Sequence, residues 1–134
     1  MREIKFRGMS HNGWLYGDLI HNRGKVYIAP IGEIYHESVP EDFEVTDVNS
    51  IGQFTGLKDE LGRDLYEGDI IESSYGKRHF IKYDDSNGAF VAVPYSDDDF
   101  SVPRYLVKSW IFKFRKRIIG NIYDNKDLMK EETK

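Results

Sequence analysis

The sequence predicts a mainly β protein. Short stretches that alternate apolar and polar residues recur along the chain, and turn-forming glycine, asparagine and aspartate separate them. This pattern is densest at residues 51–71, where two glycine-containing turns divide three short strand segments. The composition fits a globular fold, because 40% of the 134 residues are hydrophobic and 14% are aromatic.

The first part of the chain predicts a three-stranded meander. We expect strands at residues 3–7, 14–20 and 25–29 from their content of β-branched and aromatic residues at alternating positions. Asn12-Gly13 is a strong signal for the first hairpin turn, and Asn22-Arg23-Gly24 marks the second turn.

A loop is expected next, over residues 30–42. The segment shows no convincing period, and Pro40 limits any helix there. A loop of this length often carries function or mobility. The chain then becomes extended, with a strand over residues 51–55 that we expect Gly56 to end.

Four residues are predicted to build the two turns that follow. In the first turn, Asp59 can accept hydrogen bonds from the backbone ahead of it, and Gly62 can take the positive φ that closes the turn. In the second turn, Gly68 is free to adopt positive φ, and Asp69 begins a strand over residues 69–72. Both turns fix the register of strands, so we interpret these residues as structural.

The second half of the chain predicts a further hairpin. Residues 78–83 and 89–93 read as strands, and the polar segment between them ends in Asn87-Gly88. An acidic loop with three consecutive aspartates is expected over residues 94–103. We expect six apolar residues to form most of the core: Ile70, Ile71, Phe80, Phe90, Ile119 and Ile122.

The segment at residues 104–114 fits either a helix or a strand, because its apolar residues satisfy both spacings. We favour a short helix over residues 104–110 that passes into extended chain. A last strand is expected over residues 117–122, and Asp124 or Asn125 can cap a short C-terminal helical turn.

Four blocks of the sequence are similar to those of a known family. They are REIKFR at residues 2–7, WLYG at 14–17, GQFTGLKDELGRDLYEGDII at 52–71 and IIGNIYDN at 118–125. In these blocks, and in their order, the chain resembles the YopX family of small proteins encoded by bacteriophages and prophages. The resemblance implies a β-rich fold with an SH3-like small barrel and brings no activity with it. We therefore expect an N-terminal β-meander with its connecting loop at residues 1–49 and the SH3-like barrel with a C-terminal tail at residues 50–134.

No familiar catalytic or cofactor-binding motif occurs in the sequence. The chain has no cysteine, which excludes disulfides and thiolate metal sites, and its four histidines are scattered. The nearby carboxylates of Asp59, Asp64, Glu67 and Asp69 have the chemistry for acid–base catalysis or for binding Ca²⁺ or Mg²⁺. Turn aspartates more commonly bond their own backbone. We therefore expect no catalytic residue, no metal and no cofactor.

Residues 104–117 form the charge feature that points to a ligand. They include six basic residues and no acidic one: Arg104, Lys108, Lys113, Arg115, Lys116 and Arg117. Four aromatic residues lie between them: Tyr105, Trp110, Phe112 and Phe114. Cations follow phosphates and aromatic faces stack on unpaired bases, so nucleic-acid binding is one interpretation. The other is that the aromatics belong to the core, and on that interpretation we expect them to be mostly buried.

The sequence favours a binding or interaction module that is not an enzyme, is encoded by a phage or prophage, and acts in the cytoplasm of the bacterial host. We expect the partner to be a protein that the sequence does not identify, or a second copy of the chain. A nucleic-acid-binding module that uses residues 104–117 is the alternative, which the net charge of -4 disfavours. No apolar run approaches the roughly 20 residues that span a bilayer, so no membrane association is expected.

Overall fold

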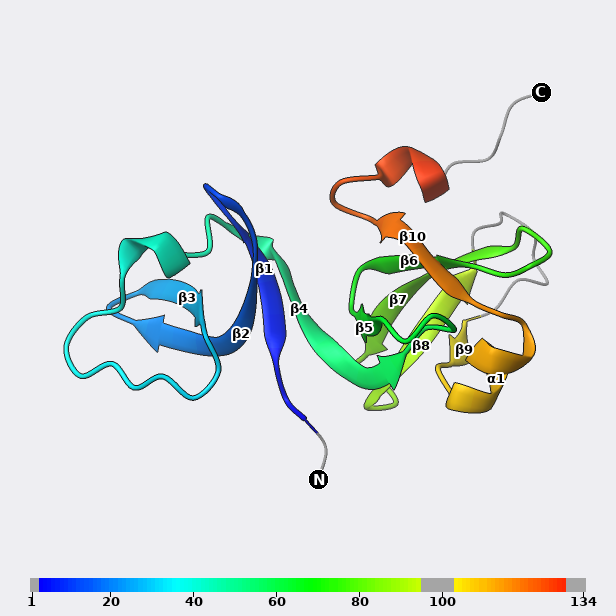
Figure 1. Ribbon diagram of the computed structural model, residues 1–134, viewed down its shortest axis with the longest axis horizontal. Coiled ribbons are helices and arrows are strands. Elements are labelled where there is room, and N and C mark those ends of the chain that lie inside the picture. Colours follow the sequence, from blue (N-terminus) through cyan, green and yellow to red (C-terminus); the bar gives the residue numbers. More distant parts are fainter. Residues whose placement is uncertain (1–2, 95–102, 130–134) are drawn as a thin grey trace. The chain divides into compact units, whose positions relative to one another are not determined.

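The computed structural model describes residues 3–94 and 103–129 and shows a mainly β protein (Figure 1). The strands, in chain order, are β1 (Phe6–Ser10), β2 (Gly13–Asn22), β3 (Lys25–Ala29), β4 (Asp47–Lys58), β5 (Asp64–Tyr66), β6 (Asp69–Glu72), β7 (Arg78–Asp84), β8 (Ala89–Pro94), β9 (Arg104–Tyr105) and β10 (Arg117–Asn121). They form two five-stranded antiparallel sheets, with the orders β3-β2-β1-β4-β5 and β10-β6-β7-β8-β9. Neither sheet closes on itself within the described residues, so the predicted SH3-like barrel is not confirmed. The chain divides into two compact units, Met1–Phe54 and Thr55–Lys134.

The first unit opens with the predicted three-stranded meander. Ser10 pairs with Gly13 at the first hairpin, and Asn22 pairs with Lys25 at the second. The first strand begins at Phe6, where pairing with β2 starts, and not at the predicted residue 3. Six buried apolar residues form the core of this unit: Tyr27, Ile28, Ala29, Val39, Val45 and Phe54.

The loop between β3 and β4 is tied to the meander at its end. It contains a short 3-10 helix, η1 (Glu41–Phe43), which falls partly inside the loop predicted at residues 30–42. Val45 N–H bonds to Val26 O at 2.8 Å. Ile31 and Ile34, near the start of the loop, are 57% and 79% exposed. The loop therefore presents two apolar side chains to solvent.

Strand β4 runs from the first unit into the second. In the first unit it pairs with β1, with Arg7 opposite Gly52, and its far end neighbours β5. Gly56 does not end the strand, contrary to the prediction. It adopts a φ of 85°, and the strand continues to Lys58. A glycine in this conformation can bend a strand without ending its pairing.

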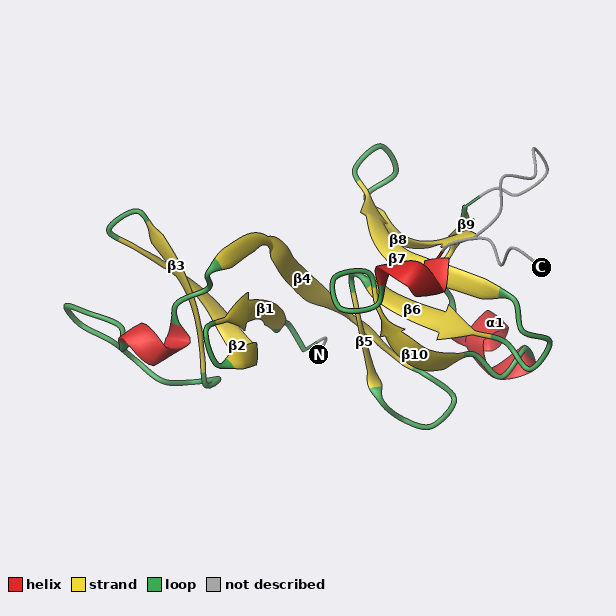
Figure 2. Ribbon diagram, turned by 90° about the horizontal axis from the view of Figure 1, so that it is seen from above, coloured by secondary structure: helices red, strands yellow, loops and turns green. Residues whose placement is uncertain are grey.

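The second sheet contains the predicted β7–β8 hairpin. Phe80 pairs with Val93, and Asp84 pairs with Ala89 at the turn. Figure 2 shows β6, β7 and β8 running side by side in this unit, with the short β9 beyond β8. The predicted acidic loop at 94–103 lies outside the described residues apart from its two ends.

Helix α1 (Lys108–Lys113) begins later than the helix predicted at residues 104–110. Arg104 and Tyr105 pair with β8 as β9, and Val107 is still extended, with φ −131° and ψ 147°. Sheet pairing therefore overrides the helical spacing of this segment. After β10, η2 (Lys126–Met129) supplies the predicted C-terminal helical turn. Within the described part of the chain, no helix has the length and apolar character needed to cross a membrane.

The core of the second unit differs from the predicted one. Its buried apolar cluster consists of Leu65, Ile71, Ile81, Ala92, Leu106, Trp110 and Ile111. Of the six predicted core residues, Ile70 and Ile71 are fully buried, and Phe90 is half-buried and packs against the cluster. Phe80, Ile119 and Ile122 are half-buried. The main reason is strand parity, because β7 buries His79 and Ile81 and leaves Phe80 on its other face. A register shift in β10 between Ile118 and Gly120 adds to the difference.

Candidate nucleic-acid interface

The short helix α1 divides its side chains between core and solvent. Trp110 and Ile111 are buried, whereas Lys108, Phe112 and Lys113 are exposed. Residues four apart lie on the same helix face, and Lys108 Nζ lies 5.9 Å from the centre of the Phe112 ring. The solvent face of α1 therefore places Lys108 beside an exposed aromatic ring, whereas Lys113 Nζ lies 5.5 Å from the centre of the half-buried Phe114 ring.

The predicted cations of this segment are exposed, with one exception. Lys116 has only 2% of its surface exposed, so it is not available to contact a nucleic acid at the protein surface, contrary to the prediction. We define the basic-aromatic surface as the exposed cations and aromatic rings of the segment: Arg104, Tyr105, Lys108, Phe112, Lys113, Arg115 and Arg117.

The expectation that the aromatic residues are mostly buried holds for only part of the segment. Tyr105 is 56% exposed and Phe112 is 45% exposed, whereas Trp110 is buried and Phe114 is half-buried. A six-residue helix turns few side chains inward, and Tyr105 lies on the two-residue strand at the edge of its sheet. Two rings are thus available for stacking.

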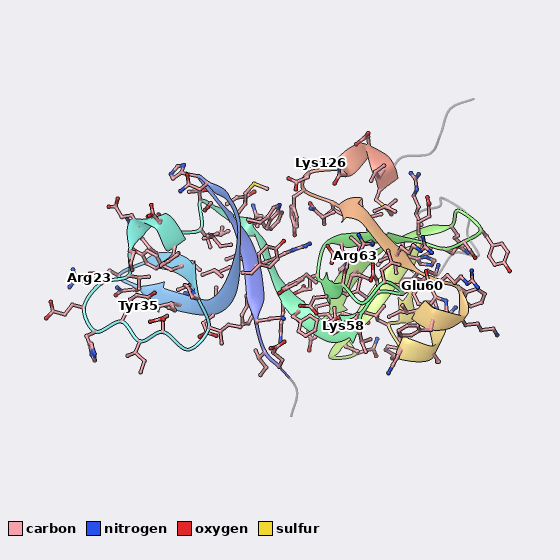
Figure 3. The ribbon with its side chains drawn as sticks, in the orientation of Figure 1. Arg23, Tyr35, Lys58, Glu60, Arg63 and Lys126 are labelled. Atoms are coloured by element: carbon pink, nitrogen blue, oxygen red, sulfur yellow. The ribbon has the colours of Figure 1, made fainter. Side chains whose placement is uncertain are left out.

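Glu60 balances part of the positive charge of this surface. Its carboxylate lies 2.6 Å from Arg117 Nε and 3.9 Å from Arg115 Nε. Figure 3 labels Glu60 near Arg63, beside the turn that follows β4. Among the described residues, no acidic side chain forms an ion pair with Arg104, Lys108 or Lys113. Local sequence patterns do not predict the Glu60–Arg117 pair, because 57 residues separate its members.

Asp59 is the buried centre of the first predicted turn, with none of its surface exposed. Its Oδ1 accepts hydrogen bonds from the N–H groups of Leu61 and Arg63, at 3.0 and 2.8 Å. Its Oδ2 accepts from Arg63 Nε at 2.9 Å and from Ile118 N–H at 3.0 Å. Burial acts to raise the pKa of Asp59, but the hydrogen bonds from Ile118 and Arg63 and the charge of Arg63 outweigh burial and lower it. Asp59 thus ties the turn to β10.

The other three turn residues also hold the backbone in place. Gly62 and Gly68 have φ values of 84° and 91°, which confirms the predicted positive φ at both. Gly68 N–H donates to Ile81 O, and its carbonyl accepts from Ile122 N–H, each at 2.8 Å. Asp69 is buried and its Oδ2 accepts from Tyr66 N–H at 2.8 Å. These contacts join the second turn to β7 and to the chain after β10.

A buried polar cluster around Trp110 was missed by the sequence analysis. Lys116 Nζ lies 3.4 Å from His79 Nδ1 and 4.4 Å from the centre of the Trp110 ring. The His79 ring packs edge-on against Trp110, with 4.9 Å between ring centres. The guanidinium carbon of Arg104 lies 4.7 Å from the centre of the same ring. The fold assembles this cluster from β7, β9, α1 and the chain before β10, so no local motif reveals it.

Burial and positive neighbours shift both titratable groups of this cluster toward their neutral forms. Burial, followed by the charges of Lys77 and Arg104, lowers the pKa of Lys116 to about 8. Burial, followed by the charges of Lys116, Lys77 and Arg104, lowers the pKa of His79 to about 3. At pH 7, His79 is therefore neutral and Lys116 is mostly charged, so Lys116 can donate to His79 Nδ1.

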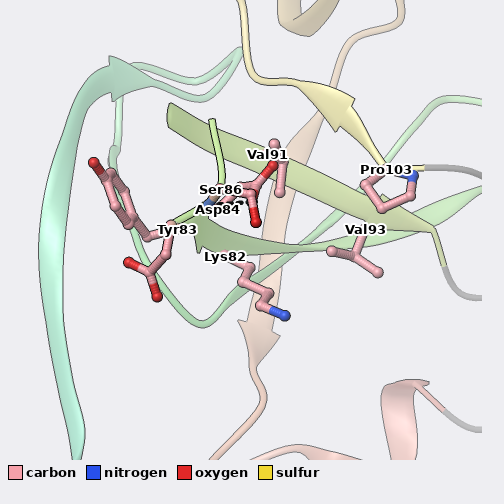
Figure 4. A pocket seen from close by; sticks show the side chains of 8 residues that line it. Lys82, Tyr83, Asp84, Ser86, Val91, Val93 and Pro103 are labelled. Atoms are coloured by element: carbon pink, nitrogen blue, oxygen red, sulfur yellow. Dashed lines mark hydrogen bonds between the residues drawn. The ribbon is translucent and has the colours of Figure 1, made fainter. Parts of the chain in front are cut away.

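A cavity of about 330 Å³ lies at the β7–β8 hairpin (Figure 4). It is lined by Lys82, Tyr83, Asp84, Asp85, Ser86, Val91, Val93 and Pro103. The Asp84 carboxylate accepts from Ser86 N–H at 3.0 Å and from Asn87 Nδ2 at 2.6 Å. This carboxylate therefore caps the hairpin turn. The described residues contain no group of three side chains suited to hold a metal ion.

Comparison with known families gives one finding. A family model described as YopX protein matches residues 5–130, which is most of the chain. No curated protein matches the sequence.

Proposed function

Since the chain belongs to the YopX family, we propose that it is a phage- or prophage-encoded binding protein without catalytic activity that acts in the cytoplasm of a bacterial host. The partner class that the basic-aromatic surface fits best is a single-stranded nucleic acid. We also propose that the second unit has an SH3-like architecture in which the β-sheet does not close into a complete barrel.

The observation that carries the proposal is the solvent face of α1. Phe112 is 45% exposed, and Lys108 and Lys113 are exposed on the same helix. Cations bind the phosphate backbone without regard to sequence, and an exposed ring stacks on a base for roughly 1–3 kcal/mol. Base faces are accessible in single strands and covered in a duplex, so this combination favours single strands.

The net charge of -4 does not oppose binding at this surface. Screening limits interactions between exposed charges to about 8 Å at physiological ionic strength, so the charges nearest the phosphates dominate. Arg104, Lys108 and Lys113 have no acidic partner among the described residues. These three cations are the ones that most directly attract a phosphate backbone.

Fluorescence anisotropy of labelled oligonucleotides tests the proposal. The full chain is titrated into a single strand and into the duplex of the same sequence at several salt concentrations. We expect tighter binding to the single strand and a steep loss of affinity with salt, because each phosphate contact releases counterions. Phe112→Ala should reduce binding to the single strand more than binding to the duplex.

Two triple variants distinguish binding at the basic-aromatic surface from a general effect of the protein's net charge. Replacement of Lys113, Arg115 and Arg117 by alanine should weaken binding to all sequences alike, because phosphate contacts position without specifying sequence. Replacement of Lys25, Lys82 and Lys126 by alanine removes the same charge elsewhere and should leave most of the affinity intact. Equal losses in the two variants, or no binding by the wild type, would contradict the proposal.

A protein partner is the second candidate, and the loop after β3 favours it. Ile31 and Ile34 are more than half exposed there, and the loop is held by a hydrogen bond from Gly32 N–H to the Asp18 carboxylate at 2.9 Å. Apolar side chains on an ordered loop are suited to contact another protein or a second copy of the chain. Sedimentation velocity of the wild type and of Ile34→Lys tests self-association. A monomer at all concentrations would remove the second copy as the partner.

A further inference from the structure

Two cations contact Trp110 in the second unit, and the residues that the structure describes supply no counter-ion to either. The Lys116 ammonium and the Arg104 guanidinium both contact the Trp110 ring, and the charges of Lys77 and Arg104 act on Lys116. No carboxylate of the described residues forms an ion pair with any of the three. A buried charge is normally paired because removing it from water costs several kcal/mol. Lys116, at 2% exposure, departs from that rule.

Among the residues that the structure describes, several hydrogen-bond donors of this cluster have no protein acceptor. Lys116 directs one N–H to His79 Nδ1, so neutral His79 carries its own proton on Nε2. Within residues 3–94 and 103–129, nothing accepts a hydrogen bond from His79 Nε2, from the Arg104 guanidinium or from a second N–H of Lys116. The Arg104 guanidinium is exposed to solvent, so its N–H groups are available to a ligand.

We infer that Lys116, His79, Arg104 and Lys77 form a binding site for a phosphate group. A phosphate has several acceptor oxygens for these donors, and its negative charge offsets the positive charges of the cluster. The Arg104 guanidinium lies over the Trp110 ring, and planar guanidinium groups bind phosphate oxygens in pairs. Arg104 and Lys77 are exposed to solvent, so an anion can reach these two side chains directly. The phosphate is either free or the terminal group of a nucleotide chain.

Binding of inorganic phosphate to the full chain tests the site. Calorimetric titration and thermal unfolding are measured in phosphate and in chloride at equal ionic strength. We expect saturable heat and a saturable rise in unfolding temperature for the wild type. Lys116→Met and Arg104→Gln should each weaken phosphate binding at least about tenfold, a change of about 1.4 kcal/mol. Lys82→Met, a matched change at an exposed lysine of β7, should bind like the wild type.

Arg104→Gln keeps the test decisive if Lys116→Met fails to fold, because Arg104 is exposed. An absence of saturable binding in the wild type would overturn the inference. Equal responses in Arg104→Gln and Lys82→Met would also overturn it, since they would indicate an adventitious ion only. Replacement of Lys113, Arg115 and Arg117 by alanine should leave phosphate binding unchanged, so this site and the nucleic-acid proposal can fail separately.

The source of the phosphate is decided by a pair of oligonucleotides. If the site takes a terminal phosphate, a 5′-phosphorylated single strand should bind at least about tenfold more tightly than its 5′-hydroxyl form. Inorganic phosphate should then abolish the difference, and so should Lys116→Met. If the two oligonucleotides bind equally while inorganic phosphate still binds, the ligand is free phosphate.

Discussion

Asp59 illustrates how one buried carboxylate can determine a local structure. Its two oxygens accept four hydrogen bonds, and the donors come from the turn itself and from Ile118. An asparagine in its place keeps one acceptor but turns an NH₂ group toward donors. We expect Asp59→Asn to lower the free energy of unfolding by on the order of 3 kcal/mol, as for a broken buried ion pair. Urea denaturation followed by circular dichroism measures this change.

Asp64→Asn is the matched control for Asp59→Asn. Asp64 pairs with Lys58 at 2.7 Å, but that lysine is largely exposed, so the loss should stay below about 1 kcal/mol. The pKa of Asp59 is lowered in the fold, so its stabilisation is present above the ordinary value of 3.8 and is lost as the pH falls through the folded-state pKa. Asp59→Asn should therefore flatten the acid side of the stability profile. Equal effects of the two substitutions would contradict the assigned role of Asp59.

Individual residues were predictable where their chemistry is local. Asp59, Gly62 and Gly68 act within turns of a few residues, and the positive φ of both glycines follows from the turn pattern. The partners of Lys116 were not predictable, because His79 is 37 residues away and meets it only through the register of the second sheet. The buried state of Lys116 also contradicts the usual exposure of lysine.

At the scale of an element, the turn between β5 and β6 depends on Gly68. Its φ of 91° is unfavourable for a β-branched residue, and its N–H and carbonyl both bond to neighbouring segments. We expect Gly68→Val to lower the free energy of unfolding by roughly 1–3 kcal/mol from backbone strain, with more from disturbed pairing. Gly62→Ala is the comparison, because Gly62 has a similar φ but no atom close to an added Cβ. Chemical denaturation should show the larger loss for Gly68→Val.

Glu60 reduces the positive charge of the basic-aromatic surface around α1. Its carboxylate pairs with Arg117 and approaches Arg115, so two cations of the basic-aromatic surface are partly neutralised. We expect Glu60→Gln to raise affinity for single-stranded oligonucleotides and to steepen its salt dependence, because freed cations add phosphate contacts. Anisotropy titrations at two salt concentrations measure both effects. Lower affinity in Glu60→Gln would show that the pair orients the arginines productively.

Elements were predicted well where turn chemistry and alternation agree, as in the meander and in the β7–β8 hairpin. The helix near residue 104 was misplaced because Arg104 and Tyr105 pair with β8, a contact set by the tertiary fold. Phe80 was assigned to the core because its strand alternates cleanly. Alternation gives the period of a strand but not which face is buried, so His79 and Ile81 were overlooked.

For the molecule as a whole, Lys116 gives the stability of the second unit a specific pH dependence. Its pKa is about 8 in the fold and 10.5 in an ordinary lysine. Between these values the unfolded chain binds a proton that the folded chain does not, so the free energy of unfolding rises with pH across this window. Below pH 8 both states are charged, and the full cost of burying the ammonium remains.

Lys116→Met isolates this cost, because methionine fills a similar volume without charge and packs well on aromatic rings. In buffer without phosphate, we expect Lys116→Met to unfold at higher urea than the wild type at pH 7. The difference should be a few kcal/mol and should shrink as the pH rises from about 8 to 10.5. Trp14→Phe in both proteins leaves Trp110 as the fluorescent reporter of the second unit. If the stability difference stays constant across this pH range, the ammonium of Lys116 is not the source of the difference. If Lys116→Met is less stable than the wild type at pH 7, the contacts of Lys116 with His79 and Trp110 outweigh the cost of burying its charge.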